Sequence, residues 1–173
     1  RGGQTLFELQ DEGLLVADRG EEPGDYLYFT YPWNARPDQL AVGEAEVKVI
    51  DGWNNFTLGN GEHEERVTLY PDHIGTHYTR LRYDMDTTDA FHTYRVEVEG
   101  DDIRIYVDGE LRIDGEGEFR HEASGRNRVS FGAANSPSMG EALWRSVRLS
   151  SPGTRGAQIH DLAVRVESGG GEE

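Results

Sequence analysis

The chain has 173 residues, enough for one sizeable hydrophobic core but too few for two ordinary domains. Its formal net charge of -16 makes nucleic acids and anionic membranes poor partners, because the long-range electrostatic force repels them. It contains no cysteine, which excludes a disulfide framework, and no apolar run near the roughly 20 residues that span a bilayer. We therefore expect a single domain over residues 1–167, followed by a flexible Gly/Glu tail at 168–173.

The first part of the chain alternates short apolar runs with turn residues. The pattern predicts strands at 5–9, 13–17 and 25–31, and the last of these ends at Pro32 because proline cannot donate to a central ladder. Trp33 follows in a loop. It would either close the end of a sandwich or offer a ring on which a sugar could stack.

The middle of the chain is predicted to form four further strands, at 40–50, 53–58, 62–70 and 74–83. In the first, Ala45 and Val47 alternate with Glu46 and Lys48, the period-two pattern of a strand that is buried on one side. The same alternation in the next strands predicts that Asn55 and Arg66 face away from the core. An acidic loop at 84–89 follows, and it lacks the glycine and final glutamate of an EF-hand, which favours a solvated turn over a calcium site.

Residues 91–113 have the most regular strand pattern in the chain. Val96 and Val98 alternate with charged residues, and the alternation resumes at Ile103 after a Gly-Asp-Asp break. Asp108-Gly109 is the residue pair favoured in two-residue hairpin turns with positive φ. We therefore expect a three-stranded antiparallel meander here, with later strands at 127–133, 141–149 and 157–166.

Two motifs of this meander resemble the centre of concanavalin A-like (laminin G-like) jelly-roll domains. The first is an aromatic residue followed by His-x-Tyr-Arg at 91–95, and the second, after a short turn, is a strand that ends in Tyr-Val-Asp-Gly at 106–109. With Trp144 and the closing strand near Leu162, the resemblance spans about 40–166. It implies an all-β fold, a jelly-roll β-sandwich of two antiparallel sheets. His92, in the motif itself, is expected to be a structural residue.

The resemblance also carries functional expectations, because such domains are attached to bacterial and archaeal glycosidases and sialidases. It implies an extracellular or cell-surface location, a carbohydrate partner and a larger multidomain protein around this chain. Members of this fold often hold one structural calcium ion through a carboxylate of the last strand. Asp161 occupies that position here.

The outward side chains of the middle strands form the candidate site. If the strands are neighbours, Lys48, Arg66, Arg80 and Arg82 gather on one face, either as cross-strand ion pairs with glutamates or as part of a sugar-binding surface. Arginine forks would suit a uronate or sulfate group, so an acidic polysaccharide is one expected ligand. The candidate ligand-binding residues are Trp53, Asn55, Glu64, Arg66, Tyr70, His73, His77 and Arg80.

Catalytic signatures are weaker. Hydrolases of this fold carry paired carboxylates in Glu-x-Asp motifs, and the stretch 62–65, Glu-His-Glu-Glu, lacks the aspartate. Three histidines near one hairpin lack the geometry of a zinc site. A lyase could use Arg66, His77, Arg80 and Tyr83. We expect a non-catalytic carbohydrate-binding module, with a polysaccharide-degrading enzyme (hydrolase or lyase) and a structural or adhesion spacer as alternatives.

Overall fold

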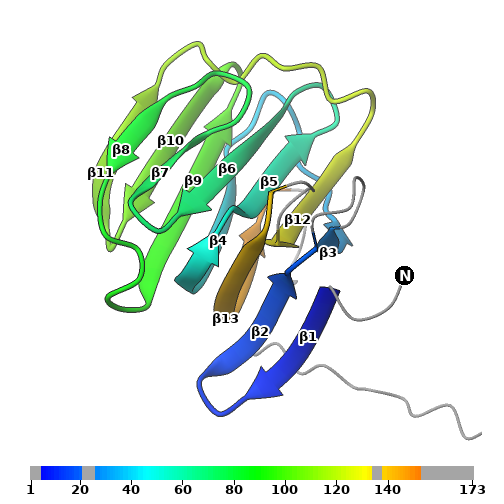
Figure 1. Cartoon of the computed structure of the whole chain (residues 1–173). Helices are drawn as coiled ribbons and strands as arrows, with labels where there is room; N and C mark the ends of the chain where they lie inside the picture. The colour runs from blue at the N-terminus through cyan, green and yellow to red at the C-terminus, as the bar shows by residue number, and fades with distance from the viewer. Residues whose placement is uncertain (1–4, 21–25, 134–137, 153–173) are drawn as a thin grey trace, which may run out of the picture.

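The computed structural model describes residues 5–20, 26–133 and 138–152, and these residues form two antiparallel β-sheets packed face to face (Figure 1). The larger sheet contains, in spatial order, β1 (Thr5–Gln10), β2 (Gly13–Asp18), β13 (Gly140–Ser150), β4 (Ala41–Gly52), β9 (His92–Glu99), β10 (Asp102–Val107) and β11 (Glu110–Gly115). The smaller sheet contains β3 (Leu27–Pro32), β12 (Asn127–Ala133), β5 (Asn54–Asn60), β6 (Glu64–Tyr70), β7 (His73–Thr76) and β8 (Arg82–Asp84). The predicted all-β class is confirmed. Among these residues, no helix is long and apolar enough to cross a membrane.

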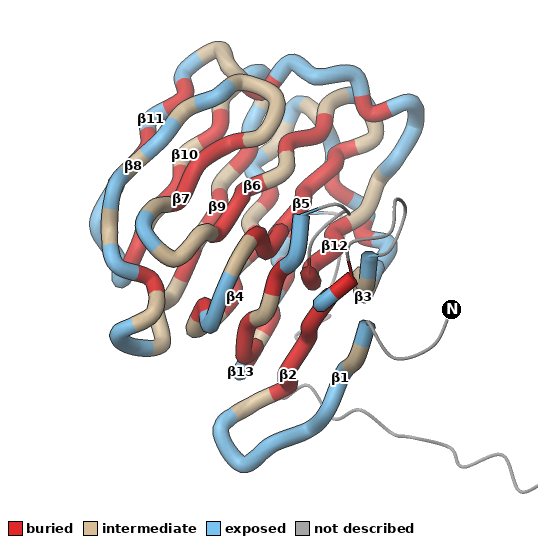
Figure 2. The backbone as a smooth tube through the Cα atoms, in the orientation of Figure 1, coloured by how far each residue is buried: buried red, intermediate tan, exposed pale blue. Residues whose placement is uncertain are grey.

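The core lies between the two sheets, where alternate side chains of each strand meet. β4 alternates buried with half-buried residues along most of its length, as the sequence pattern predicts. Trp144 from the seven-stranded sheet and Phe56 from the six-stranded sheet are both fully buried. Figure 2 shows buried backbone through the central strands of both sheets, whereas β1 at the edge is mostly exposed.

The predicted meander is confirmed as β9, β10 and β11. In the turn between β10 and β11, Asp108 has φ 51° and Gly109 has φ 84°, the positive values that a tight hairpin turn of this twist requires. Trp33 also has a settled role, because its ring is 3% exposed and its indole Nε1 donates to the Gly59 carbonyl at 2.7 Å. The interpretation of Trp33 as a plug at the end of the sandwich is confirmed.

The single strand expected at 74–83 is wrong. β7 ends at Thr76, the chain reverses at 77–80, and β8 starts at Arg82. The backbone N–H groups of Tyr78 and Thr79 donate to a buried carboxylate, at 2.9 and 3.2 Å, instead of continuing a ladder. The predicted strand at 157–166 and the tail at 168–173 lie outside the described residues, so the domain boundaries stay a prediction.

His92, at the start of β9, joins two loops. Its Nδ1 lies 2.7 Å from Asp108 Oδ2 and its Nε2 lies 2.9 Å from Asp89 Oδ1, so both ring nitrogens have a carboxylate partner. The structural role predicted for His92 is confirmed. Burial alone would lower the pKa of His92, but the hydrogen bonds to Asp108 and Asp89 outweigh it and raise the pKa above its usual range.

This pair of bonds leads to a pH-dependent prediction. Because the folded pKa of His92 is raised, its stabilisation is complete below the unfolded pKa of about 6.5 and is lost as the pH rises through the folded value. Both aspartates are more than half exposed, so screening limits the effect to about 1 kcal/mol. We expect His92→Gln to lower the free energy of unfolding by that amount at about pH 5.5, and by much less at about pH 9. Urea denaturation at both pH values would measure this, and an equal loss at both would contradict it.

Candidate functional site

The centre of the six-stranded sheet is formed by β5, β6 and β7, whose side chains alternate between the core and the opposite surface. Phe56 and Val67 are fully buried in the core. Their neighbours in sequence, including Asn55 and Arg66, therefore point to the other side of the sheet. We call this surface, opposite the core, the outer face. Cross-strand pairing brings its residues together, because Asn55 lies opposite Thr68.

The eight candidate residues all fall on this sheet or on its turns. Asn55 lies on β5, and Trp53 is the residue directly before that strand. On β6, three candidates share one side of the strand: Glu64, Arg66 and Tyr70. His73 begins β7. His77 and Arg80 lie in the turn after β7, where Arg80 has a φ of 63°. The structure thus places the eight on one sheet, whereas their role as ligand contacts stays a prediction.

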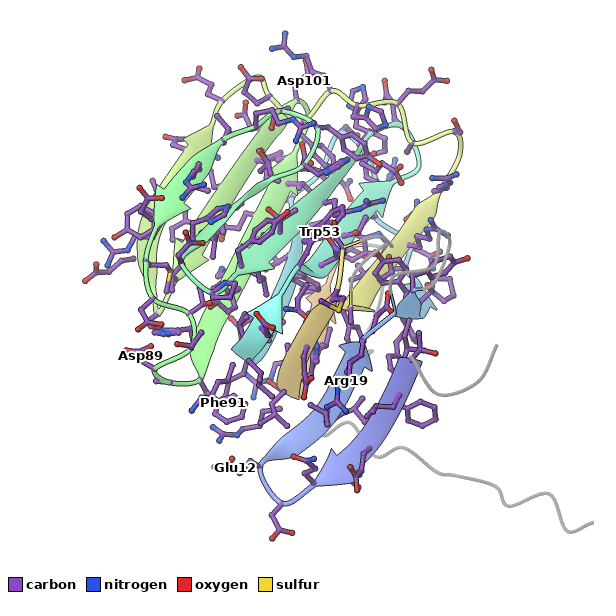
Figure 3. The ribbon with its side chains drawn as sticks, in the orientation of Figure 1. Glu12, Arg19, Trp53, Asp89, Phe91 and Asp101 are labelled. Atoms are coloured by element: carbon purple, nitrogen blue, oxygen red, sulfur yellow. The ribbon has the colours of Figure 1, made fainter. Side chains whose placement is uncertain are left out.

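Aromatic rings form a connected group on the outer face. The ring of Trp53, which Figure 3 labels, stacks on His77 with a centroid distance of 5.5 Å and on Tyr70 at 6.3 Å. Tyr70 in turn stacks on His73 at 4.5 Å, with the two planes 10° apart. The guanidinium carbon of Arg66 lies 5.7 Å from the Trp53 ring. Trp53 is only 9% exposed, so it supports its neighbours more than it offers a free surface.

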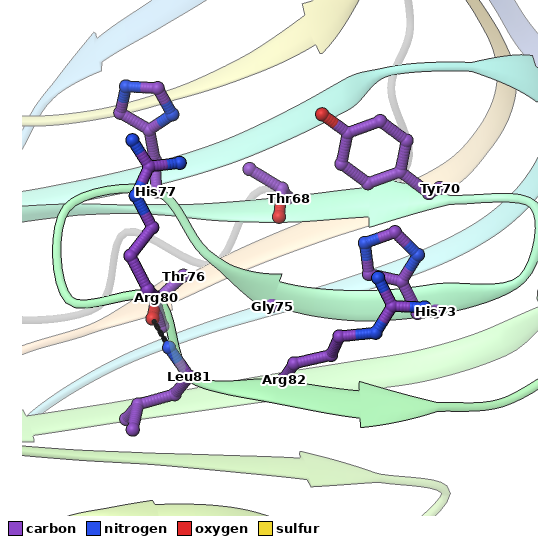
Figure 4. Close-up of a pocket in the computed structure, with 9 residues that line it drawn as sticks. All are labelled: Thr68, Tyr70, His73, Gly75, Thr76, His77, Arg80, Leu81 and Arg82. Atoms are coloured by element: carbon purple, nitrogen blue, oxygen red, sulfur yellow. Dashed lines mark hydrogen bonds between the residues drawn. The ribbon is translucent and has the colours of Figure 1, made fainter.

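A hollow of about 290 Å³ lies beside this group (Figure 4). In that view the guanidinium of Arg80 lies near the ring of His77, and that of Arg82 lies near His73. The hollow is lined by Thr68, Tyr70, His73, Gly75, Thr76, His77, Arg80, Leu81 and Arg82. Its walls therefore carry cationic, hydroxyl and aromatic groups together, which suits a polar ligand with ring faces.

The ionic environment of the arginines distinguishes this face. Among the described residues, the arginines with no carboxylate within 4.0 Å are Arg66, Arg80 and Arg128. All three belong to the six-stranded sheet or to its turn, and Arg128 alternates with the buried Val129 on β12. Guanidinium groups without a nearby carboxylate give this face a local positive charge on an otherwise acidic protein, and such groups attract anions.

The outer surface of the seven-stranded sheet has the opposite character. Arg148 and Arg95 both contact Glu44, at 3.1 and 3.9 Å, and Arg145 contacts Glu46 at 2.5 Å. Cross-strand ion pairs therefore neutralise these arginines. Of the four cations expected to gather on one face, Arg82 pairs with Asp72 and Asp84 rather than with a glutamate. The expected grouping of Lys48 with Arg66 is wrong, because Lys48 lies on β4 in the other sheet.

Tyr28 joins the outer face from β3. Its hydroxyl accepts a hydrogen bond from Asn55 Nδ2 at 2.9 Å across Gly132, the β12 residue that pairs with both. A side chain at Gly132 is excluded, because a Cβ would lie 2.0 Å from the Leu27 carbonyl oxygen. Burial raises the pKa of Tyr28, although the charge of Arg66 acts to lower it.

His77 has the opposite shift. Burial lowers its pKa, and the charges of Arg66, Arg80 and His121 lower it further. The lowered pKa favours the uncharged form of the ring at neutral pH. An uncharged imidazole can accept a proton or a hydrogen bond, which a charged one cannot.

Glu64 differs from the other candidates. It is 3% exposed, and its carboxylate contacts Arg126 at 3.2 Å and the Tyr78 hydroxyl at 3.4 Å. It therefore supports Tyr78, whose ring stacks on His121 with a centroid distance of 3.5 Å. Sequence reasoning gave His121, Tyr28 and Arg128 no role at the site, because strand order decides which of them reach the outer face.

Four other expectations were made from the sequence, for Tyr83, the histidines, the acidic loop and Asp161. Tyr83 was a candidate for lyase chemistry, but it packs against the core, on the wrong side of β8. His63 contacts Phe119 and lies apart from His73 and His77, and within the described ranges no group of three metal-ligating side chains is present. In the acidic loop, Asp86 accepts hydrogen bonds from the N–H and hydroxyl of Thr88, and the buried Thr87 bonds to the backbone of Tyr70 and Val49. Asp161 lies outside the described residues, so the structural calcium ion stays a prediction.

Comparison with solved structures identifies the fold of the chain. No protein-family model and no curated protein sequence matches the chain. Among solved structures, the alginate lyase AlyC3 is 16% identical, with a TM-score of 0.58 over 83% of this chain and 77% of the lyase. The carbohydrate-binding module CBM66 from Bacillus subtilis is 14% identical, with a TM-score of 0.55 over 85% of this chain and 92% of the module. The chain has the concanavalin A-like jelly-roll fold.

A sialidase has the same jelly roll as one part of a longer chain. It is 16% identical, with a TM-score of 0.58, and the match covers 87% of this chain and 16% of the sialidase. The resemblance seen in residues 91–109 is thus confirmed at the level of the fold. Similar jelly rolls occur in a lyase, a binding module and a sialidase, so the site must decide the function.

Proposed function

We propose that this jelly-roll domain binds an acidic polysaccharide on the outer face of the six-stranded sheet, as a non-catalytic module of an extracellular carbohydrate-active protein. The observation that carries the proposal is the group formed by Arg66, Arg80 and Arg128, which have no carboxylate partner among the described residues of a chain with a net charge of -16. Each of the other arginines in the described part of the chain has a carboxylate within 4.0 Å. The three exceptions lie on one sheet.

The chemistry of the face matches such a ligand. A guanidinium can bind a uronate carboxylate through two parallel hydrogen bonds, and aromatic rings bury the apolar face of a sugar ring. Tyr70 and His73 provide rings beside the hollow, and Arg80 lines it. The net charge opposes an anionic ligand at long range, but physiological salt screens exposed charges beyond about 8 Å, so the local arginines dominate at contact.

The similar structures support a carbohydrate ligand. They include a carbohydrate-binding module and several alginate lyases, and the match covers most of the binding module as well as most of this chain. The absence of a paired-carboxylate motif at 62–65 favours binding over glycoside hydrolysis. An extracellular location follows from the same proposal, because polysaccharides of this kind are encountered outside the cell.

The proposal is tested by affinity electrophoresis in gels that contain a polyuronate such as alginate or the same polymer after chemical reduction of its carboxyl groups. We expect the polyuronate to retard the protein and the reduced, neutral polymer to retard it far less. The two polymers share backbone and linkages, so the difference isolates the carboxylate. Equal retardation by both would contradict an acidic ligand, and no retardation by any polysaccharide would favour a structural spacer.

A second candidate function is polysaccharide lysis by β-elimination, favoured by the uncharged His77 and the Tyr28–Asn55 bond on the same face. In this reaction Arg66 would pair with the uronate carboxylate, and His77 would take the proton from the carbon beside it. The glycosidic C–O bond would then break to leave an unsaturated sugar, and the Tyr28 hydroxyl would protonate the departing oxygen.

Ultraviolet absorbance of the unsaturated product distinguishes this candidate from simple binding. If the protein is a lyase, absorbance rises with time on a polyuronate, and both His77→Gln and Tyr28→Phe abolish the rise while retardation in the gel remains. A polymer that binds without any rise in absorbance leaves the non-catalytic module as the function.

A further inference from the structure

The turn at 77–80, which carries His77, Tyr78 and Arg80, is held from inside the sandwich by one carboxylate. Glu65 on β6 is 1% exposed and lies on the core side of the strand, in line with the buried Val67. Its carboxylate accepts hydrogen bonds from three backbone N–H groups and one hydroxyl. These are the N–H of Arg66 at 2.8 Å, Tyr78 at 2.9 Å and Thr79 at 3.2 Å, and the Thr79 hydroxyl at 3.1 Å.

The hydroxyl bond continues into a directed chain. A carboxylate only accepts, so the Thr79 hydroxyl must donate to Glu65. The Thr76 hydroxyl, 2.8 Å from that of Thr79, then donates to it and accepts in turn from the N–H of Leu81 at 2.8 Å. These bonds join both ends of the turn to Glu65. They also hold Arg80 in a left-handed conformation that residues other than glycine seldom adopt.

A buried carboxylate is an unusual occupant of this position. The inward residues that follow on β6 are Val67 and Leu69, and packing alone would be met by a third apolar side chain. A glutamate at such a site is costly unless every oxygen is satisfied, and here the satisfying donors come mainly from the turn. The interaction therefore serves the geometry of the turn more than the packing of the core.

We propose that Glu65 is a positioning residue, which fixes His77, Tyr78 and Arg80 on the outer face in the arrangement that binds the polysaccharide. The inference rests on the proposed function for its binding role. Its structural half, that the carboxylate sets the position of the turn, can be measured without any ligand.

Glu65→Gln tests both halves. The glutamine has a similar shape and keeps one acceptor oxygen, but in either orientation its NH₂ faces a backbone N–H of the turn, that of Tyr78 or that of Thr79. Because two donors cannot bond to each other, we expect the turn to move. As His77 then leaves its partly buried place near Arg66 and Arg80, we expect its pKa, followed by NMR titration of the ring, to rise towards the ordinary value. Affinity for a polyuronate is expected to fall about tenfold, while far-ultraviolet circular dichroism stays unchanged.

The sign of the pKa change makes the test specific. Loss of the negative charge of Glu65 would by itself lower the pKa of a nearby histidine, so only a displaced turn raises it. Glu62→Gln is the matched control, since it removes the same charge from an exposed residue three positions earlier and should change neither reading. If Glu65→Gln does not fold, Thr79→Val removes one of the four bonds to Glu65, together with the bond from the Thr76 hydroxyl, and should raise the pKa of His77 by a smaller amount.

The outcomes separate this inference from the proposed function. An unchanged or lowered pKa of His77 in a folded Glu65→Gln, with undiminished affinity, would overturn the positioning role. If the pKa of His77 rises in Glu65→Gln but the wild-type protein binds no polysaccharide, Glu65 does position the turn and the proposed function is refuted. A raised pKa with wild-type affinity would show that the turn is not part of the binding surface, which also overturns the inference.

Discussion

Replacing Arg66 and Arg80 together with glutamine is expected to lower the affinity for an acidic polysaccharide by about 100-fold, because each guanidinium would contribute roughly 1.5 kcal/mol as a charge-assisted hydrogen bond. Neither arginine has a carboxylate partner among the described residues, so their removal leaves no buried charge behind and should preserve the fold. Isothermal titration calorimetry with polyuronate oligosaccharides, at about 0.15 M salt to screen the net charge, gives the affinity.

Arg148→Gln is the matched control for this experiment. It removes the same charge from the outer surface of the seven-stranded sheet, where Arg148 is 55% exposed and pairs with Glu44. We expect its affinity to stay within about twofold of wild type, because exposed ion pairs contribute little and the site lies on the other sheet. Similar losses in both variants would mean that the ligand responds to net charge alone and that the outer face has no special role.

Trp53→Ala is expected to have the largest effect on stability of any substitution at the site. The ring is 9% exposed and stacks on Tyr70 and His77, so truncation leaves a cavity and should lower the free energy of unfolding by about 3 kcal/mol. It should also lower polysaccharide affinity at temperatures where the variant remains folded, because Arg66 and His77 lose their contacts with the Trp53 ring. Chemical denaturation and calorimetry on the same samples measure the two effects.

Trp53→Phe separates stacking from hydrogen bonding. Phenylalanine keeps a ring against His77 but has no indole N–H, and in the structure that N–H has no partner among the described residues. We therefore expect Trp53→Phe to retain most of the stability and most of the affinity. Full affinity in Trp53→Ala would show that the aromatic group on the outer face is structural only.

The faces of individual strands could be predicted from the sequence, because period-two alternation fixes each side chain relative to its own core. Asn55 and Arg66 face away from the core as expected, since Phe56 and Val67 alternate with them. Alternation cannot say which sheet a strand joins. Alternation alone therefore groups Lys48 with Arg66, although β4 pairs with β13 and β9 in the other sheet.

Part of the site depends on strand pairing between distant segments, which the sequence pattern does not reveal. Tyr28 reaches Asn55 only because β3 and β5 both pair with β12 and because Gly132 leaves space between them. The break in the strand expected at 74–83 was hidden for a similar reason, since it depends on a carboxylate from β6 that captures the N–H groups of the turn. Glu65 itself gave no signal in the sequence, where it stands among three other polar residues at 62–65.

NMR titration of the ¹⁵N-labelled protein with a polyuronate oligosaccharide would locate the binding site residue by residue. Shifts are expected for the backbone amides of Thr68 and Gly75, which line the hollow on the six-stranded sheet. They are also expected for the backbone amide of Arg66, whose carbonyl accepts from the His77 N–H, and for the side-chain amide of Asn55, which lies opposite Thr68. The amide resonances of β10 and β11, in the other sheet, should not shift. Shifts confined to the seven-stranded sheet, or none at saturating oligosaccharide, would contradict a binding site on the outer face.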